Sequence, residues 1–375
     1  MTSDTALIEK REELKRRLAA GEYKTLVDVV LDWMSRVIQK ITRIPKPISP
    51  WYSSVMLSSV IMLLTLTALF LMGDVSVFMR QMAKFPRGAA LSLLLPGYFV
   101  PLIMAVCNLY VHRVFTIFHD RVLDVTESMT TLNDFEIWST GVSNRKVHLI
   151  VSIVGGVLTN GYILYIYAIT FGSGLIPPIS IVIFFVLSYM ILTAFLYLLF
   201  YMVVLSARIG RYQLKLYTTD PGSSEVISQL ASLFSNLLYL VAILAASVML
   251  FLAFIGFLTI QTLVGTILLF WIPLIAMFLF YQSSLSSIVR GAKEKTLNEI
   301  QTKIEKLHTS EKLGEKDTME TINRLMDYYD RIKNTRSSRI DLEAVLHLFN
   351  SLLLPLLALV LTNLDKLIGL FTKQP

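Results

Sequence analysis

The amino-acid sequence predicts an all-α, polytopic membrane helical bundle with about seven transmembrane helices, a cytoplasmic N-terminus and a cytoplasmic helical hairpin. Three observations lead to this fold class: the composition, the lengths of the uncharged stretches and the distribution of basic residues. Of the 375 residues, 54% are apolar and 16% are charged, and the mean hydropathy is +0.62. Soluble domains carry about 25% charged residues, so the composition indicates that much of the chain lies in lipid.

The uncharged stretches give the number of spans. Residues 51–73, 88–112 and 344–364 contain no Asp, Glu, Lys or Arg, and they are 23, 25 and 21 residues long. A helix needs about 20 apolar residues to cross the hydrocarbon layer, so each of these stretches predicts one span. Residues 147–207 and 226–289 form longer uncharged stretches of 61 and 64 residues, and each predicts two spans. The expected spans lie at residues 51-73, 88-112, 147-171, 178-207, 229-254, 262-282 and 344-364.

Both long stretches contain an interruption at a suitable place. Phe171-Gly-Ser-Gly-Leu-Ile-Pro-Pro178 divides the first, because Gly and paired Pro disfavour a continuing helix. Gly256 and Gln261 loosen the apolar pattern of the second. The six spans of residues 51-282 are therefore expected to form one transmembrane region, which precedes the terminal span at 344-364.

The basic residues give the orientation, because Lys and Arg are retained on the cytoplasmic side of a membrane. With seven spans, 29 of the 34 Lys and Arg residues fall on the side of the N-terminus and 5 on the opposite side. The N-terminus is therefore expected in the cytoplasm of a multi-pass protein of the cell membrane. Asn350 and Pro355 leave one alternative open, in which a kinked 344–364 segment enters the membrane and returns to the same side.

Residues 1-50 form a basic amphipathic region. Its apolar residues recur at helical spacing, and basic residues flank them: Leu26, Val30, Trp33, Val37 and Ile41, with Lys24, Arg36, Lys40 and Arg43. One interpretation is a helix in the plane of the lipid bilayer surface, attracted by anionic lipid headgroups. The other is a helix packed on the protein's own loops, and the sequence does not separate the two.

Residues 283-343 predict a cytoplasmic hairpin of two helices. Leu297, Ile300, Ile304 and Leu307 form one apolar stripe, and Ile322, Tyr329 and Ile332, with Leu325 or Met326, form a second. A two-helix hairpin cannot bury both stripes by itself. It is therefore expected to pack on other cytoplasmic helices or on a neighbouring subunit of a homo-oligomer.

The sequence contains no catalytic or metal-binding motif. There is no phosphate-binding Gly-rich loop, no His-Glu-x-x-His and no nucleophile elbow, and Cys107 is the single cysteine. Asp134 and Glu136 are expected to form a solvated helix cap rather than an acid/base pair. We expect no enzyme activity, no cofactor and no metal. We also expect no nucleic-acid partner, because topology accounts for the net charge of +7.

The predicted spans hold neutral polar residues but no ionisable Asp, Glu, Lys or Arg, which argues against proton coupling and voltage sensing. Such residues either line a pore or pocket, or they form hydrogen bonds between helices. The pore or pocket candidates are Asn350, Pro355, Thr362, Asn363 and Asn160. Gly155, Gly156 and Gly161 are expected to allow close helix approach. Residues 153–161 and the aromatic residues of 184–201 either line a cavity or pack together.

Two functions fit these features. The first is a channel-like homo-oligomer with the last span near the pore. In layout this prediction resembles the insect odorant and gustatory receptor channels, which have an inside N-terminus, seven spans and a helical cytoplasmic base. The Thr-Tyr and Gln-Phe residues of their last span are not found in 344–364, so the resemblance assigns no residue. The alternative is a non-conducting membrane scaffold, sensor or effector that binds a partner through its cytoplasmic helices.

Overall fold

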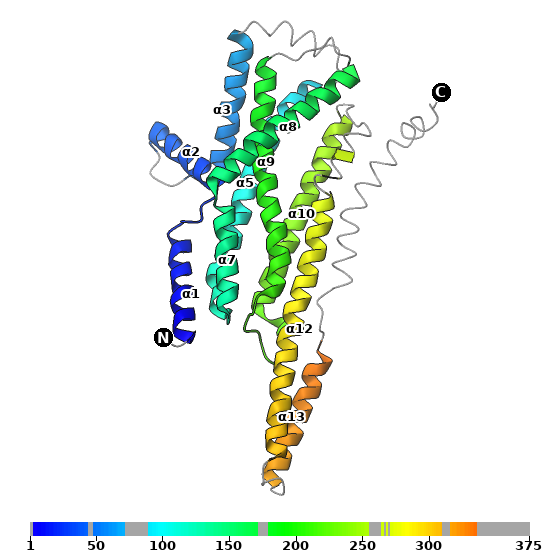
Figure 1. Ribbon diagram of the computed structural model, residues 1–375. Helices are drawn as coiled ribbons and strands as arrows, with labels where there is room; N and C mark the ends of the chain where they lie inside the picture. Colours follow the sequence, from blue (N-terminus) through cyan, green and yellow to red (C-terminus); the bar gives the residue numbers. More distant parts are fainter. Residues whose placement is uncertain are drawn as a thin grey trace, which may run out of the picture.

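The computed structural model describes residues 3–43, 48–71, 89–171, 179–254, 264–265, 268, 271–309 and 316–335. Every named element in this part of the chain is a helix, and its one isolated β-bridge joins Thr126 to Leu214. The predicted all-α fold is therefore confirmed. Figure 1 shows long helices that run side by side, with one helical pair extending far below the others.

Four helical stretches of the described chain are long and apolar enough to cross a membrane: Pro101–Val125, Tyr189–Arg211, Glu225–Ala245 and Ile272–His308. They belong to the long helices of the bundle, which are α3 (Pro50–Leu71), α5 (Ala89–Ile117), α8 (Arg145–Phe171), α9 (Ile179–Arg208), α10 (Glu225–Phe254) and α12 (Ile272–His308). The chain thus has the helices of a membrane protein. The count of seven spans and the cytoplasmic N-terminus stay predictions, and the 344–364 segment lies outside the described residues.

Helix α8 buries its polar side and exposes its apolar side. Its buried positions recur every four residues and are polar or small: His148, Ser152, Gly156 and Asn160. The neighbouring positions carry large apolar side chains that are exposed: Val147, Leu149, Ile150, Val151, Ile153, Val154, Val157 and Leu158. A surface helix in water has the opposite arrangement, whereas helices in lipid associate through small and polar residues. The surroundings that suit α8 are therefore lipid.

Two glycines let α8 approach α9 closely. A Cβ atom on Gly156 would lie 2.9 Å from the backbone nitrogen of Met190, and one on Gly155 would lie 2.7 Å from Cγ2 of Thr193. The prediction of close approach is confirmed at these two positions. No such approach is found at Gly161, where no atom of the described residues lies within 4 Å of an added Cβ.

The N-terminal region contains two helices, α1 (Ser3–Ala19) and α2 (Leu26–Thr42). Between them the backbone turns at Gly21, whose φ of +71° favours glycine. Thr25 then caps α2 in a reciprocal capping box with Asp28. In Figure 1, α1 lies beside α7 (Met129–Val142), and α2 projects sideways at the base of α3.

Helix α5 continues beyond its apolar segment through a π-helical turn, η1 (Phe118–Val122), into the short α6 (Leu123–Val125). An aromatic cluster covers this extension. The ring of Phe118 stacks on Phe135 of α7 at a centroid distance of 4.3 Å, and Trp138 stacks on both. The indole nitrogen of Trp138 donates a hydrogen bond to the carbonyl of Tyr201 on α9, at 2.8 Å. Helix α7 is thereby fixed to the lower halves of α5 and α9.

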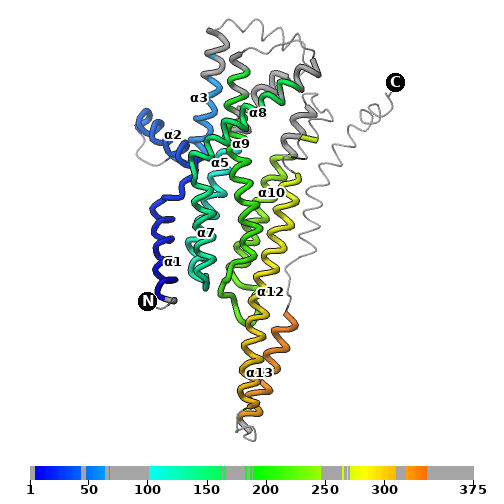
Figure 2. The backbone as a smooth tube through the Cα atoms, viewed as in Figure 1, coloured from blue at the N-terminus to red at the C-terminus, as the bar shows by residue number. Residues whose placement is uncertain are grey.

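Helix α12 has 37 residues, which at 1.5 Å per residue makes it about 55 Å long. It runs without interruption from the bundle into the lower projection (Figure 2), where α13 (Lys316–Asn334) packs against it. Ile300 of α12 and Ile322 and Ile332 of α13 are buried at this contact. The short 3-10 turns η2 (Ile209–Arg211) and η3 (Pro221–Ser223) complete the connection from α9 to α10.

The close contact between α8 and α9 predicts opposite effects for two glycine substitutions. Gly156→Ala should destabilise the protein by about 1–3 kcal/mol, because the new methyl group overlaps the Met190 backbone. Gly291→Ala is the matched control within α12. An added Cβ there meets no atom within 4 Å, so this variant should gain about 0.5–1 kcal/mol from lower unfolded-chain entropy. Thermal unfolding in detergent measures both, and equal shifts would contradict the predicted packing.

Candidate functional sites

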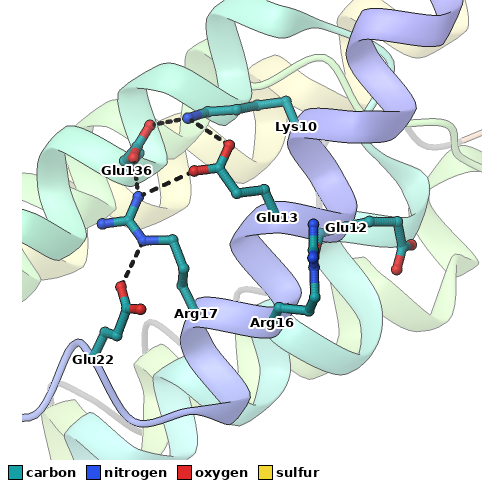
Figure 3. Close-up of polar contacts among 7 residues, drawn as sticks. All are labelled: Lys10, Glu12, Glu13, Arg16, Arg17, Glu22 and Glu136. Carbon is teal, nitrogen blue, oxygen red and sulfur yellow. Dashed lines mark hydrogen bonds and ion pairs between the residues drawn. The ribbon is translucent and has the colours of Figure 1, made fainter.

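The first candidate site is a network of charges that joins α1 to α7 (Figure 3). Glu136 of α7 lies between two basic residues of α1, with 2.6 Å between its Oε2 and Nζ of Lys10, and with a hydrogen bond from Arg17 to its Oε1. Arg17 also pairs with Glu22 in the turn after α1, at 2.7 Å, and with Glu13 at 3.7 Å. One carboxylate on α7 thus holds two successive turns of α1.

Further contacts extend this docking along α1. Lys15 pairs with Asp124 of α6, and Arg11 donates a hydrogen bond of 2.7 Å to the carbonyl of Thr126. The apolar Leu14 on the same helix is fully buried. Helix α1 is therefore fixed by one buried apolar side chain and by charged contacts on both sides of it.

The position of Glu136 decides its charge state. Burial raises the pKa of Glu136, but the hydrogen bonds and charges of Lys10 and Arg17 outweigh this effect and hold the pKa below the ordinary value. The same contacts raise the pKa of Lys10 against the effect of burial. Both partners are therefore ionised at neutral pH. The expectation of a solvated cap is wrong here, since Glu136 binds α1 and Asp134 pairs with Arg208 of α9 at 3.2 Å.

The second candidate site joins α2 to α5. Oδ2 of Asp28 accepts hydrogen bonds from the Thr25 backbone N–H at 2.9 Å and from the Thr25 hydroxyl at 2.8 Å. Its other oxygen, Oδ1, accepts a hydrogen bond from the side-chain amide of Asn108 in α5. Burial raises the pKa of Asp28, although the hydrogen bonds from Thr25 act in the opposite direction. A partly desolvated carboxylate thus connects α2 to a helix that is apolar enough to span a membrane.

The third candidate site is the polar seam between α8 and α9. Nε2 of His148 lies 3.1 Å from the carbonyl oxygen of Ala194, and the imidazole stacks on Tyr197 at a centroid distance of 4.4 Å. One turn later, the hydroxyl of Thr193 lies 3.0 Å from the carbonyl oxygen of Ser152 and 2.9 Å from that of Tyr189 in its own helix, and it can donate to either. Nε2 of His148 and the Ser152 carbonyl thus meet partners inside the pair of helices, where lipid offers none. Nδ1 of His148 is buried and has no partner among the described residues.

A groove of about 500 Å³ lies along this seam. It is lined by Val147, Val151, Gly155, Thr193, Leu196, Tyr197, Phe200 and Tyr201. Because the lining is almost entirely apolar, the groove suits a hydrocarbon chain better than a polar ligand. Tyr197, Phe200 and Tyr201 line the groove and also pack on one another, and Tyr197 stacks on His148. These three residues therefore fit both alternatives for the aromatic residues of 184–201.

The predicted pore or pocket residues have different outcomes. Asn160 is only 5% exposed on the seam face of α8, and its Oδ1 has no hydrogen-bond partner in the described part of the chain. It does not line the groove. Asn350, Pro355, Thr362 and Asn363 lie outside the described residues, so their roles stay predictions. Cys107 is buried in α5, and the described residues contain no cluster of three His, Cys, Asp or Glu side chains that could bind a metal ion.

The fold and these sites define a helical membrane protein with a polar seam inside its apolar bundle and a charged helix docked beneath it. Comparisons with protein-family models, with curated proteins and with solved structures find no match.

The charge network predicts an acid-sensitive attachment of α1. Because the folded-state pKa of Glu136 is depressed, its contribution is present above the unfolded pKa and is lost as the pH falls through the folded value. The protection of the α1 amides, relative to the intrinsic exchange rate at each pH, should therefore fall below about pH 4.5. Glu136→Gln should cost about 1 kcal/mol at pH 7 and should remove this pH dependence. Acid-induced exchange that is identical in the variant would contradict the assignment.

The contact between α2 and α5 predicts the opposite pH response for a different variant. Asn108→Asp would place a second carboxylate beside Asp28, and two carboxylates at this distance share one proton with a raised pKa. The variant should be less stable than the parent at pH 7 and should recover part of the difference at pH 5. Asn108→Leu has no titratable group and is the control. Thermal unfolding at the two pH values distinguishes them, and parallel curves would exclude the direct contact.

Proposed function

We propose that the chain works as a channel-like homo-oligomer of the cell membrane, in which a cytoplasmic base formed by α12 and α13 is coupled to the spanning helices. The terminal 344–364 segment lies near the pore in this proposal. The observation that carries it is the continuity of α12 between the apolar bundle and the projecting pair of helices. A displacement of the base is transmitted to the bundle because no flexible loop separates them.

The upper part of α12 is tightly seated. Tyr281 stacks on Phe234 of α10 at a centroid distance of 5.6 Å, and Leu285 is buried beside it. A Cβ atom on Gly210 in η2 would lie 2.9 Å from Cα of Ser284, so the two backbones are in direct contact. This part of α12 cannot shift without moving α10 and η2.

The lower part of α12 holds the end of α13. Nζ of the buried Lys293 donates hydrogen bonds to the backbone carbonyls of Lys333 and Thr335, at 2.8 and 2.7 Å. A positive charge at the C-terminal end of a helix also complements the helix dipole. In the sequence, Thr335 precedes the 344–364 segment. In this proposal Lys293 therefore connects α12 to the part of the chain that leads to the predicted last span.

The exposed faces of the projecting helices α12 and α13 support assembly with other copies of the chain. Beyond the bundle, α12 and α13 bury a single narrow stripe between them, and Met319 and Met326 of α13 are exposed. Two helices alone bury too little apolar surface for independent stability. Neighbouring copies would cover the remaining faces in an oligomer.

The same exposed faces also support the alternative, a non-conducting scaffold, sensor or effector that binds a partner through these helices. The alternative requires α12 to present α13 but does not require movement in the membrane. Ion conduction, and its dependence on an unbroken α12, therefore distinguish the channel from the scaffold, sensor or effector.

The test compares two variants at Gly291, where α12 leaves the bundle. Gly291→Pro removes one helical hydrogen bond and costs about 3 kcal/mol locally, whereas Gly291→Ala keeps the helix. Purified protein is reconstituted into nanodiscs for mass measurement and into liposomes for ion flux. We expect an oligomer with flux for the parent and for Gly291→Ala, and an oligomer with altered flux for Gly291→Pro.

A monomer without flux would contradict the channel proposal. An oligomer or monomer that does not conduct but captures a soluble protein through α12 and α13 would favour the alternative. Equal flux in all three proteins would contradict coupling through α12.

A further inference from the structure

Helix α2 has two apolar faces, and the protein covers the second only in part: Leu26, Val30 and Val37 are half-buried there, and Val30 packs against the core. Val27, Leu31, Met34 and Ile38 are buried against the bundle. The stripe singled out in the sequence lies about a quarter-turn away, since each residue advances about 100° around a helix. On this second face Trp33 is 57% and Ile41 is 76% exposed. The packing interpretation of the N-terminal region is thus confirmed for the first face, and the lipid interpretation stays a prediction for the second.

Basic residues border the open face of α2. Arg36 follows Trp33 by one helical turn, and Lys40 directly precedes Ile41, so both lie close to this face. Arg43 follows at the helix end. No carboxylate of the described residues forms an ion pair with these three side chains, although Lys24 pairs with Asp32 at 2.7 Å. In α1, by contrast, Lys10, Lys15 and Arg17 all pair with acidic residues. Within the described part of the chain these three cations therefore have no acidic partner, and Arg36 donates a hydrogen bond to the carbonyl of Asp32 at 3.3 Å.

Three contacts fix the position of α2 along the axes of the apolar helices. Helix α3, which contains no charged residue, begins at Pro50 next to the end of α2. The carbonyl of Lys24 accepts a hydrogen bond of 3.5 Å from Arg145, the first residue of α8. Asn108, which binds Asp28, is followed in α5 by His112 and Arg113. Helix α2 therefore lies where three apolar helices end and charged residues begin.

We infer that the open face of α2 rests in the surface of an anionic lipid bilayer, with Trp33 and Ile41 among the acyl chains and Arg36 and Lys40 at the headgroups. Figure 1 shows α2 projecting outward from the bundle at the base of α3. Tryptophan is enriched at this depth because one end of its ring is apolar and the other is a hydrogen-bond donor. Basic side chains beside an inserted apolar face are attracted by anionic headgroups.

The open face of α2 makes a different type of contact from the contacts of α1. Helix α1 is held by ion pairs within the protein, whereas α2 completes its apolar and charged contacts with lipid. The bilayer thus takes part in positioning the N-terminal region, and the lipid charge adjusts how firmly α2 is held. The inference is independent of conduction and of oligomeric state.

Tryptophan quenching in liposomes tests the inference on the full chain. Two preparations contain the same mixture of phosphatidylcholine and phosphatidylglycerol, and the bromine quencher is carried by the neutral lipid in one and by the anionic lipid in the other. The contribution of Trp33 is the difference between the parent and Trp33→Phe, which keeps an aromatic side chain at an exposed position. We expect this contribution to lose most of its intensity, with greater quenching by the brominated anionic lipid.

Two double variants test the role of charge. R36Q/K40Q should reduce the excess quenching by the anionic lipid, because the headgroup contacts are lost. The control R16Q/K306Q removes the same charge from exposed positions on α1 and at the far end of α12, and it should keep the excess. Absence of Trp33 quenching in both preparations would show that protein covers the face and would overturn the inference. Equal quenching of the Trp33 contribution by the two brominated lipids would also overturn the inference, because α2 would then have no preference for anionic lipid.

Discussion

The packing of α8 against α9 depends on one constraint: a polar group surrounded by hydrocarbon must find its partner inside the protein. Helix α8 turns His148, Ser152 and Asn160 inward. His148 Nε2 and the Ser152 carbonyl meet partners on α9, whereas Oδ1 of Asn160 has none among the described residues. The paired glycines allow the two backbones to approach, so that Thr193 reaches the carbonyl of Ser152. The large apolar side chains are then left for the lipid. Close backbone contact and polar contacts between the helices thus replace the hydrophobic core that would hold the same helices together in water.

Below this region the interactions change in character. The lower halves of α5 and α9 are joined to α7 by stacked aromatic rings, and α1 is attached through Glu136 and Asp124. This is the packing of a protein in water, with a closed apolar core and charges at its border. The protein therefore combines two types of packing along the same helices. Helix α12 passes through both, which is why it is central to the proposed coupling.

The fold class could be predicted from the sequence because its evidence is local. A stretch without charge is a property of neighbouring residues, and so is the helical spacing of Ile322 and Ile332. The partners of Glu136 could not be predicted, since Lys10 and Arg17 lie more than 100 residues away and several other cations would satisfy the same pattern. The buried face of α2 was missed for a different reason. Val27 and Leu31 form a stripe as regular as that of Trp33 and Ile41, and only the neighbouring helices distinguish them.

The candidate sites show the same limit. The sequence singled out Asn160 as polar and intramembrane, but its burial and its unsatisfied oxygen emerge only in the structure. Asp28 and Asn108 each have an ordinary local explanation, as a helix cap and as a polar residue in a span, and their contact emerges only in three dimensions.

The burial of Cys107 has a practical consequence for work on this protein. It is the single cysteine of the chain, it lies in α5 one residue before Asn108, and solvent does not reach it. The native thiol is thus shielded from maleimides, so a cysteine introduced at an exposed position can be labelled without first constructing a cysteine-free background. Slow modification of the native thiol would in turn time the separation of α5 from its neighbours.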